Sequence, residues 1–117
     1  MIICLCGSTK YPLAHLTQMA KETLKGNIVL PMGVYGHADF PKGAKELTSD
    51  SDHNAPCKQM LDKLHLQKID MCDEVVIVVH NEYVGDGTVS DIEYAKKQGK
   101  SVRMAYSTDD SLRRGIL

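Results

Sequence analysis

Apolar residues along this chain gather in short runs that alternate with amphipathic segments. The runs span residues 2–6, 28–30, 74–79 and 101–106, and each is too short for a helix of ordinary length. The third run, Glu74-Val75-Val76-Ile77-Val78-Val79, is apolar without interruption after its first residue, as a strand covered on both faces requires. The pattern therefore predicts four strands, of which at least one lies inside a sheet.

Helical periodicity fills much of the space between these runs. A first helix is expected from Pro12, a residue that suits a first helical turn, to a stop at Gly26. Residues 56–72 predict a second helix, and residues 88–98 predict a third that Gly99 ends. Strands that alternate with helices imply right-handed crossovers. We therefore expect an α/β fold, a doubly wound parallel sheet of four to five strands with helices on both faces.

The length of 117 residues is that of one domain, so we expect a single domain over residues 1–117. Two segments lack periodicity: a long connection at about residues 31–55 and a polar C-terminal tail at residues 107–117. A connection longer than ~15 residues is typical of a functional or mobile loop. The tail is expected to be either a short helix or disordered.

Charge and composition argue against several classes of function. The formal net charge is −1, and no basic stripe is present to neutralise a nucleic-acid backbone. No apolar stretch approaches the ~18–20 residues that span a bilayer, and the first residues lack the pattern of a secretory signal. Four cysteines without framework spacing fit a reducing cytoplasm, and Cys4 and Cys6 share one strand face, which indicates a place in the core. We therefore expect a cytoplasmic protein that binds no long nucleic acid and no membrane.

The loop after the first strand is a candidate binding element. It comprises Gly7, Ser8, Thr9, Lys10 and Tyr11 and leads directly into a helix N-terminus. Free N–H groups and the helix dipole favour a phosphate or a sugar hydroxyl at such a position. Because neither a G-x-G-x-x-G motif nor a Walker loop is present, a plain helix cap with a solvated lysine is an equally good interpretation.

A second candidate element follows the strand at residues 74–79. Asp86, Gly87 and Thr88 lead into a helix that places Asp91 in its first turn, beyond the carboxyl end of the strand, where open parallel sheets bind ligands. In one interpretation, Thr88 and Asp91 form a capping box that closes the first helical turn. In the other, the helix N-terminus lowers the pKa of Asp91, and its ionised carboxylate attacks the anomeric carbon of a sugar. Asp86 would then bind a ribose hydroxyl.

Three further residues are candidates for the same site. Asp73 follows the second predicted helix and is a candidate to orient the site, and His65 lies about two helical turns before it. His37 lies in the long connection beside Tyr35 and Phe40, on which a base could stack. The five histidines show no metal-ligand spacing, so no metal site is expected.

Three stretches carry a family resemblance when they are taken together. They are C-G-S-T at residues 6–9, L-H-L-Q-K-I-D-M-C-D-E-V-V at residues 64–76 and G-T-V-S-D-I-E-Y-A at residues 87–95, followed by Gly99-Lys100. In order and spacing the chain resembles, over roughly residues 2–106, the nucleoside 2-deoxyribosyltransferase superfamily, which includes small nucleoside-monophosphate N-glycosidases. The resemblance implies a flavodoxin-like fold with a five-stranded parallel sheet and a site at its carboxyl edge. A neighbouring subunit often completes that site, so a homodimer or higher homo-oligomer is also implied.

The resemblance assigns roles to individual residues. Asp91 stands in the place of the family's glutamate nucleophile, which attacks C1′ of the sugar, and is one methylene shorter. Asp73 matches the family's aspartate at the start of the third strand, and Asp86 roughly matches an acidic residue before the motif. Residues 7–10 match the loop that contacts the 5′-phosphate in the glycosidase branch. His65 stands where many members of that branch place an aspartate.

These observations predict an enzyme that needs no cofactor and acts on a small nucleoside or nucleotide. It would cleave or exchange the N-glycosidic bond of a (deoxy)nucleoside or nucleoside 5′-monophosphate through a carboxylate nucleophile, as a hydrolase or a transferase. His65 or His37 would supply the proton that the leaving base needs. Two alternatives stay open: a non-catalytic nucleotide-binding module, and an enzyme on the same fold that acts on NAD or a related dinucleotide.

Overall fold

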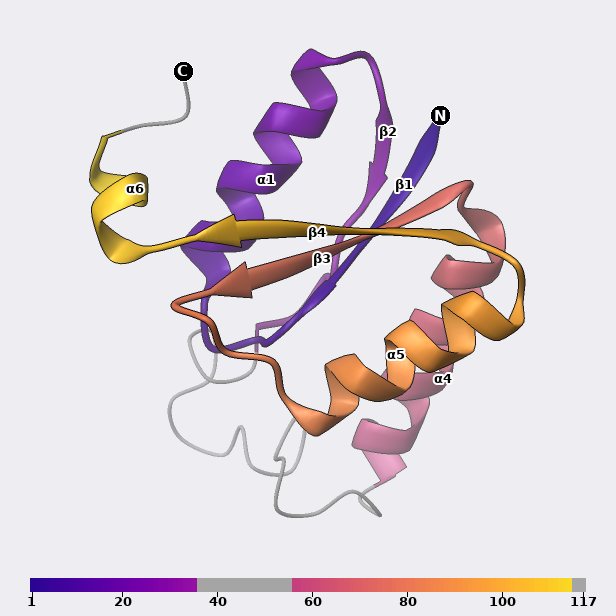
Figure 1. Cartoon of the computed structure of the whole chain (residues 1–117). Helices are drawn as coiled ribbons and strands as arrows, with labels where there is room; N and C mark the ends of the chain where they lie inside the picture. The colour runs from indigo at the N-terminus through magenta and orange to yellow at the C-terminus, as the bar shows by residue number, and fades with distance from the viewer. Residues whose placement is uncertain (36–55, 115–117) are drawn as a thin grey trace.

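The fold is described for residues 1–35 and 56–114 of a computed structural model (Figure 1). Strands and helices alternate in the order β1 (Ile2–Gly7), α1 (Pro12–Leu24), β2 (Ile28–Leu30), α4 (Pro56–Met71), β3 (Glu74–His80), α5 (Asp86–Lys97), β4 (Ser101–Ser107) and α6 (Asp109–Arg113). The predicted strands and helices are confirmed, with α5 beginning earlier than expected. Among the described helices, none is both long and apolar enough to cross a membrane.

The four strands form one sheet in the order β2-β1-β3-β4, and every pair is parallel. The expected α/β fold with helices around a parallel sheet is therefore confirmed, and it is consistent with a flavodoxin-like fold. The fifth strand that the resemblance implies is not among the described residues, so β4 lies at the edge of the sheet they form. The central strands β1 and β3 pair from Ile3↔Glu74 to Gly7↔Val78.

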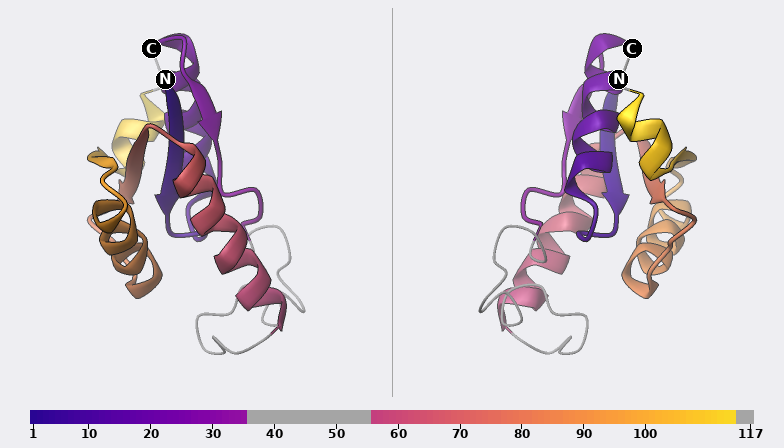
Figure 2. Two further views of the ribbon diagram at one scale, coloured as in Figure 1. Left: turned by 90° about the vertical axis from the view of Figure 1, so that its right-hand side faces the viewer. Right: turned by 90° about the vertical axis from the view of Figure 1, so that its left-hand side faces the viewer.

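Each face of the sheet carries its own hydrophobic core. Alternate residues of a strand point to opposite faces, so Cys4, Cys6 and Ile77 pack under α4 and α5, whereas Ile3 and Leu5 pack under α1 and α6. The two views of Figure 2 show α4 and α5 in front of the strands in one and α1 and α6 in front in the other. Burying one such aliphatic side chain contributes about 1.5–3 kcal/mol. The predicted core position of the two cysteines is confirmed.

A buried carboxylate joins α1 to β3 and β4 near the amino end of β3. Glu22 of α1 is fully buried, and its Oε1 accepts a hydrogen bond from Arg103 Nη2 of β4 at 2.9 Å. Arg103 Nε also donates to Glu74 of β3 at 3.2 Å. Burial alone would raise the pKa of Glu22, but the bond and charge of Arg103 outweigh it and hold the pKa below its ordinary value. The Arg103 guanidinium therefore links α1, β3 and β4.

The C-terminal tail begins with a short helix, α6. Thr108 Oγ1 accepts a hydrogen bond from the Ser111 backbone N–H, and Ser111 Oγ accepts one from the Thr108 N–H, which together form a capping box. His80, buried at the end of β3, contacts Ser107 Oγ through Nδ1 and Asp109 Oδ1 through Nε2, both at 2.8 Å. Of the two expectations for the tail, a short helix is therefore the one seen for residues 109–113.

Replacing Arg103 tests the buried link. Arg103→Met should lower the free energy of unfolding by about 1–3 kcal/mol, because it removes a charged partner from a buried carboxylate. Lys25→Met is the matched control: Lys25 Nζ lies 3.4 Å from the same carboxylate, but its side chain is 59% exposed. An exposed pair of this kind contributes less than about 1 kcal/mol. Urea unfolding of both variants measures the difference, and equal losses would contradict the assignment.

Candidate functional site

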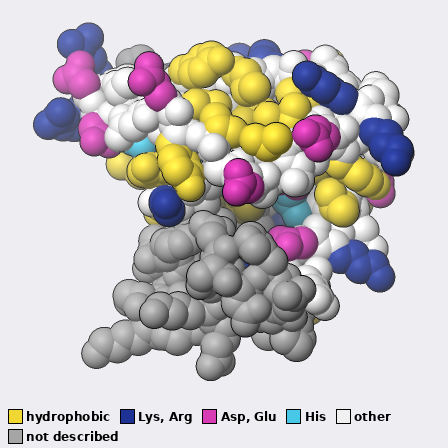
Figure 3. All heavy atoms as spheres, turned by 60° about the horizontal axis from the view of Figure 1, so that its bottom comes forward, with side chains coloured by type: hydrophobic (Ala, Val, Ile, Leu, Met, Phe, Trp, Pro, Cys, Tyr) yellow, Lys and Arg dark blue, Asp and Glu magenta, His cyan; other side chains and the backbone are white. Residues whose placement is uncertain are grey.

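A cleft of about 430 Å³ opens where β1 and β3 end and where α4 and α5 face each other. This volume lies in the range of small-molecule pockets. Its polar lining includes Ser8 and Thr9 after β1, His65 on α4, and Asp86, Thr88 and Asp91 on α5. Figure 3 brings the lower side of Figure 1 forward, and the lysine and arginine side chains on that view are scattered rather than gathered into a stripe.

Helix α5 presents Asp91 to the cleft from its second turn. The helix begins at Asp86, and its N-cap is Gly85, which makes no side-chain capping hydrogen bond. Thr88 is therefore the third helical residue and Asp91 the sixth, so the interpretation of this pair as a capping box is wrong, as is the placement of Asp91 in the first turn. The Asp91 carboxylate is not occupied in closing its own helix. Its side chain is 20% exposed and lines the cleft.

Burial controls the charge of this carboxylate. Desolvation, followed by repulsion from Asp62, raises the pKa of Asp91 to about 7, and Lys58 opposes the rise. The expectation that the helix N-terminus lowers this pKa is wrong. The dipole of a helix acts within its first turn, whereas Asp91 lies one turn further along and is mostly removed from water. A carboxyl group of this kind is about half ionised at neutral pH.

The structure brings His65 and Asp91 together, as the sequence predicts. His65 Nε2 lies 3.5 Å from Asp91 Oδ2 and 3.0 Å from Cys6 Sγ. Burial lowers the pKa of His65 to about 4, and Lys68 adds to the effect. The imidazole is therefore neutral at the pH values at which Asp91 is ionised, so their contact is polar and not an ion pair. His65 Nδ1 is buried and has no hydrogen-bond partner among the described residues.

The loop after β1 approaches the backbone of β3 closely. Gly7 has a φ of +151°, and a Cβ added there would lie 2.7 Å from the carbonyl oxygen of Val78. His15 of α1 lies below the same loop, with Nε2 3.1 Å from the Ser8 carbonyl oxygen. Ser8 Oγ accepts a hydrogen bond from the Lys10 N–H at 3.2 Å. The loop is thus held from two sides, and its Ser8 and Thr9 face the cleft.

Lys10 and Tyr11 differ from the rest of this loop, because they are not among the residues that line the cleft. Lys10 Nζ lies 4.6 Å from the ring centroid of Tyr83 and 3.4 Å from its hydroxyl. The Tyr11 ring packs on His80 with centroids 4.8 Å apart. Tyr83 itself lines the cleft and was not singled out by the sequence.

The structure does not bring Asp73 to the cleft. Its Oδ2 accepts a hydrogen bond of 2.7 Å from the backbone N–H of Ile2. Because Ile2 begins β1 and Asp73 precedes β3, this contact lies at the amino ends of the parallel strands, whereas the cleft lies at their carboxyl ends. Among the other predicted residues, Asp86, Gly87 and Thr88 do line the cleft. His37 lies outside the described residues.

Comparisons of the chain with protein families, with curated proteins and with solved structures found no match. The family resemblance therefore stays a prediction from the motifs, and the site has to be interpreted from its own geometry. That geometry places three features around a cavity of ligand size: a carboxylate that caps no helix, a neutral imidazole, and a loop that carries a glycine and two hydroxyl side chains.

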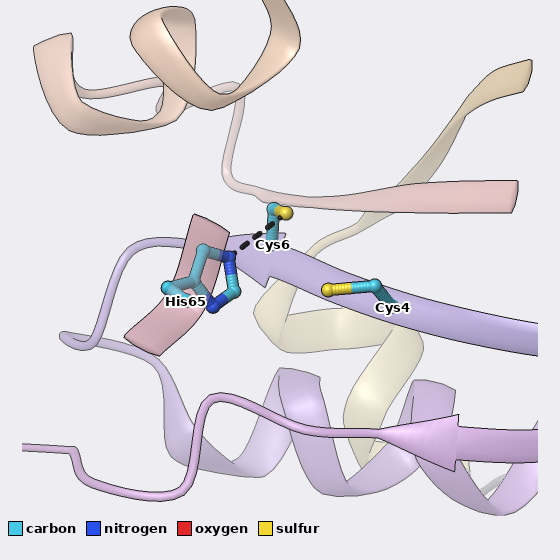
Figure 4. A group of neighbouring side chains, drawn as sticks. All are labelled: Cys4, Cys6 and His65. Atoms are coloured by element: carbon cyan, nitrogen blue, oxygen red, sulfur yellow. Dashed lines mark hydrogen bonds between the residues drawn. The ribbon is translucent and has the colours of Figure 1, made fainter. Parts of the chain in front are cut away.

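Cys6 is the contact of this site that the sequence did not indicate. Together with Cys4 and His65 it forms a group whose sulfur and nitrogen atoms all lie within 4.8 Å of one another (Figure 4). The absence of a metal site was expected from the spacing of the histidines. A site that combines one histidine on a helix with two cysteines on a strand has no recognisable spacing in the sequence. Its residues come together only because α4 packs on β1.

A loop glycine can be tested directly. Gly7→Ala should destabilise the protein and disturb the cleft, because its methyl group would overlap the Val78 carbonyl oxygen at 2.7 Å. We expect a loss of about 1–3 kcal/mol, the ordinary range for overpacking. Gly99→Ala is the control: it also has a positive φ, +74°, but has open space around it. Thermal unfolding compares them, and a loss at Gly7 no greater than at Gly99 would refute the close contact.

The buried His15 predicts a pH effect on stability. Burial lowers the pKa of His15 to about 4, below the value of about 6.5 expected in the unfolded chain. The folded state therefore resists protonation, so this contribution is complete above pH 6.5 and is lost as the pH falls towards 4. The stability of the wild type relative to His15→Gln should fall by roughly 3 kcal/mol between pH 8 and pH 4. Parallel pH curves in urea unfolding would contradict this.

Proposed function

We propose that this protein cleaves or exchanges the N-glycosidic bond of a (deoxy)nucleoside or nucleoside 5′-monophosphate, with Asp91 as the nucleophile. The observation that carries the proposal is the Asp91 carboxylate itself. This carboxylate caps no helix, is 20% exposed and lines a cleft that Ser8 and Thr9 also line. The motif resemblance to nucleoside 2-deoxyribosyltransferases supports the same assignment.

The cleft offers chemically distinct partners for the parts of a nucleotide. Backbone N–H groups and hydroxyls of Ser8 and Thr9, before α1, suit a 5′-phosphate or 5′-hydroxyl. The exposed Asp86 and the buried Thr88 suit sugar hydroxyls. Tyr83 lines the same cleft and provides an aromatic face for a base. All of these residues line the same cleft as Asp91, which supports the proposal.

The proposed reaction is a displacement at C1′ of the sugar. A carboxylate oxygen of Asp91 forms a bond to C1′ while the bond from C1′ to the base nitrogen breaks, and the base nitrogen keeps the electron pair and takes up a proton. Water or a second base then displaces the Asp91 carboxylate from C1′ and loses one proton to solvent, which restores the enzyme. Water gives hydrolysis and a base gives transfer.

His65 fits the role of a positioning residue in this proposal. Its pKa of about 4 leaves the imidazole neutral near pH 7, so it has no imidazolium proton to give to the base. Its Nε2, 3.5 Å from Asp91 Oδ2, instead orients the carboxylate. The other predicted proton donor, His37, lies outside the described residues, so its role stays a prediction.

Substitution of Asp91 tests the proposal. We expect the wild type to release free base from at least one member of a panel of nucleoside 5′-monophosphates, measured by chromatography. Asp91→Asn should slow release by at least about a thousandfold, as for the loss of a nucleophile. Asp91→Glu, which lengthens the arm by one methylene, should retain release. Glu93→Gln is the matched control, because Glu93 is an exposed carboxylate of the same helix that does not line the cleft.

Three results would contradict the proposal. Release that is unchanged in Asp91→Asn would remove the carboxylate from the chemistry. Tight nucleotide binding without any release would favour a binding module. Nicotinamide released from NAD, with no base released from monophosphates, would favour an enzyme that acts on dinucleotides.

A further inference from the structure

We infer that Cys4, Cys6 and His65 form a binding site for a thiophilic divalent cation, of which Zn²⁺ is the natural example, beside the floor of the cleft. The inference concerns binding alone and does not depend on the proposed enzymatic function. It rests on where α4 packs against β1, which brings one imidazole over two thiols of a single strand face (Figure 4).

The spacing of the three ligand atoms is close to that of a tetrahedral site. The atoms all lie within 4.8 Å of one another, and Cys6 Sγ is 3.0 Å from His65 Nε2. Bonds of about 2.3 Å to sulfur and 2.0–2.1 Å to nitrogen place tetrahedral ligand atoms roughly 3.5–3.8 Å apart. Side-chain rotations that move each atom by about 1 Å or less therefore suffice.

The three side chains are free to make this adjustment. The Cys4 thiol makes a long contact of 4.0 Å to the Leu5 carbonyl oxygen and also hydrogen-bonds with the Cys6 thiol, which is itself one of the three ligands. No hydrogen bond to a described residue holds Nδ1 of the His65 ring in place. Cys72, another buried cysteine of the same core, differs: its thiol donates to the Ile69 carbonyl oxygen at 3.0 Å.

The donor set selects the class of cation. Thiolate and imidazole ligands suit zinc and its soft analogues, whereas magnesium and calcium require oxygen ligands. His65 lines the cleft, so a cation can arrive from that side although Cys4 and Cys6 are fully buried. A fourth, non-protein ligand such as water completes the tetrahedron, so Asp91 is not needed for it. Binding of one cation by two thiols releases two protons to solvent, so the charge balances.

Cadmium provides the direct test. The reduced protein of 117 residues, freed of metal by a chelator, is titrated with Cd²⁺ while the ultraviolet cadmium–thiolate charge-transfer band is recorded. We expect the band to saturate at one equivalent and Zn²⁺ to abolish it by competition. Cys4→Ser and Cys6→Ser should each reduce the band by about half and weaken binding by about tenfold or more. Cys72→Ser, the matched control, should keep the full band.

His65→Gln keeps the inference testable if either cysteine variant does not fold. It leaves both thiols in place and should weaken Cd²⁺ binding by about tenfold or more. The absence of a band in the wild type at stoichiometric Cd²⁺ would overturn the site. A band that survives Cys4→Ser and Cys6→Ser but is lost in Cys72→Ser would overturn it as well. Base release plays no part in these measurements, so they fail or succeed independently of the proposed reaction.

Discussion

The burial of β1 and β3 on both faces is the constraint on which the rest of this structure depends. Their side chains are apolar in both directions, so neither face of the sheet can be left to water, and helices must cover each one. Because the strands are parallel, every crossover begins at the edge of the sheet that carries their carboxyl ends. The cleft at the carboxyl ends therefore follows from the way the helices cover both faces of the sheet. The polar residues around it lie on the loops and helices that begin at this edge.

The same packing that stabilises the sheet sets the chemistry of the cleft. His65 and Asp91 are titratable groups on helices that have to lie close to the sheet, and both lose much of their water there. Desolvation pushes their pKa values in opposite directions, towards the neutral form of each group. Near pH 7 the charge of the cleft therefore comes mainly from Lys58, Asp62, Lys68 and Asp86, which also line it.

The strands, the sheet and most helices could be predicted from the sequence, because run length and periodicity report burial directly. The start of α5 could not, because Gly85 caps it without a side-chain signal, and that shift moved Asp91 from a capping position to a free one. The position of Asp73 was predictable in principle, since a residue that precedes a strand lies at its amino end. The contact between Cys6 and His65 depends on how α4 packs against β1, which no local pattern encodes.

The close fit of Gly7 against Val78 makes one wall of the cleft part of the sheet itself. The backbone at Gly7 cannot move closer to β3, so this wall of the cleft is fixed. Any change in the shape of the cleft therefore has to occur on the opposite side, where α4 and α5 contact each other through side chains and share no backbone hydrogen bonds of a sheet. The width of the cleft is then set by the distance between α4 and α5, because the opposite wall is fixed by the hydrogen bonds between β1 and β3.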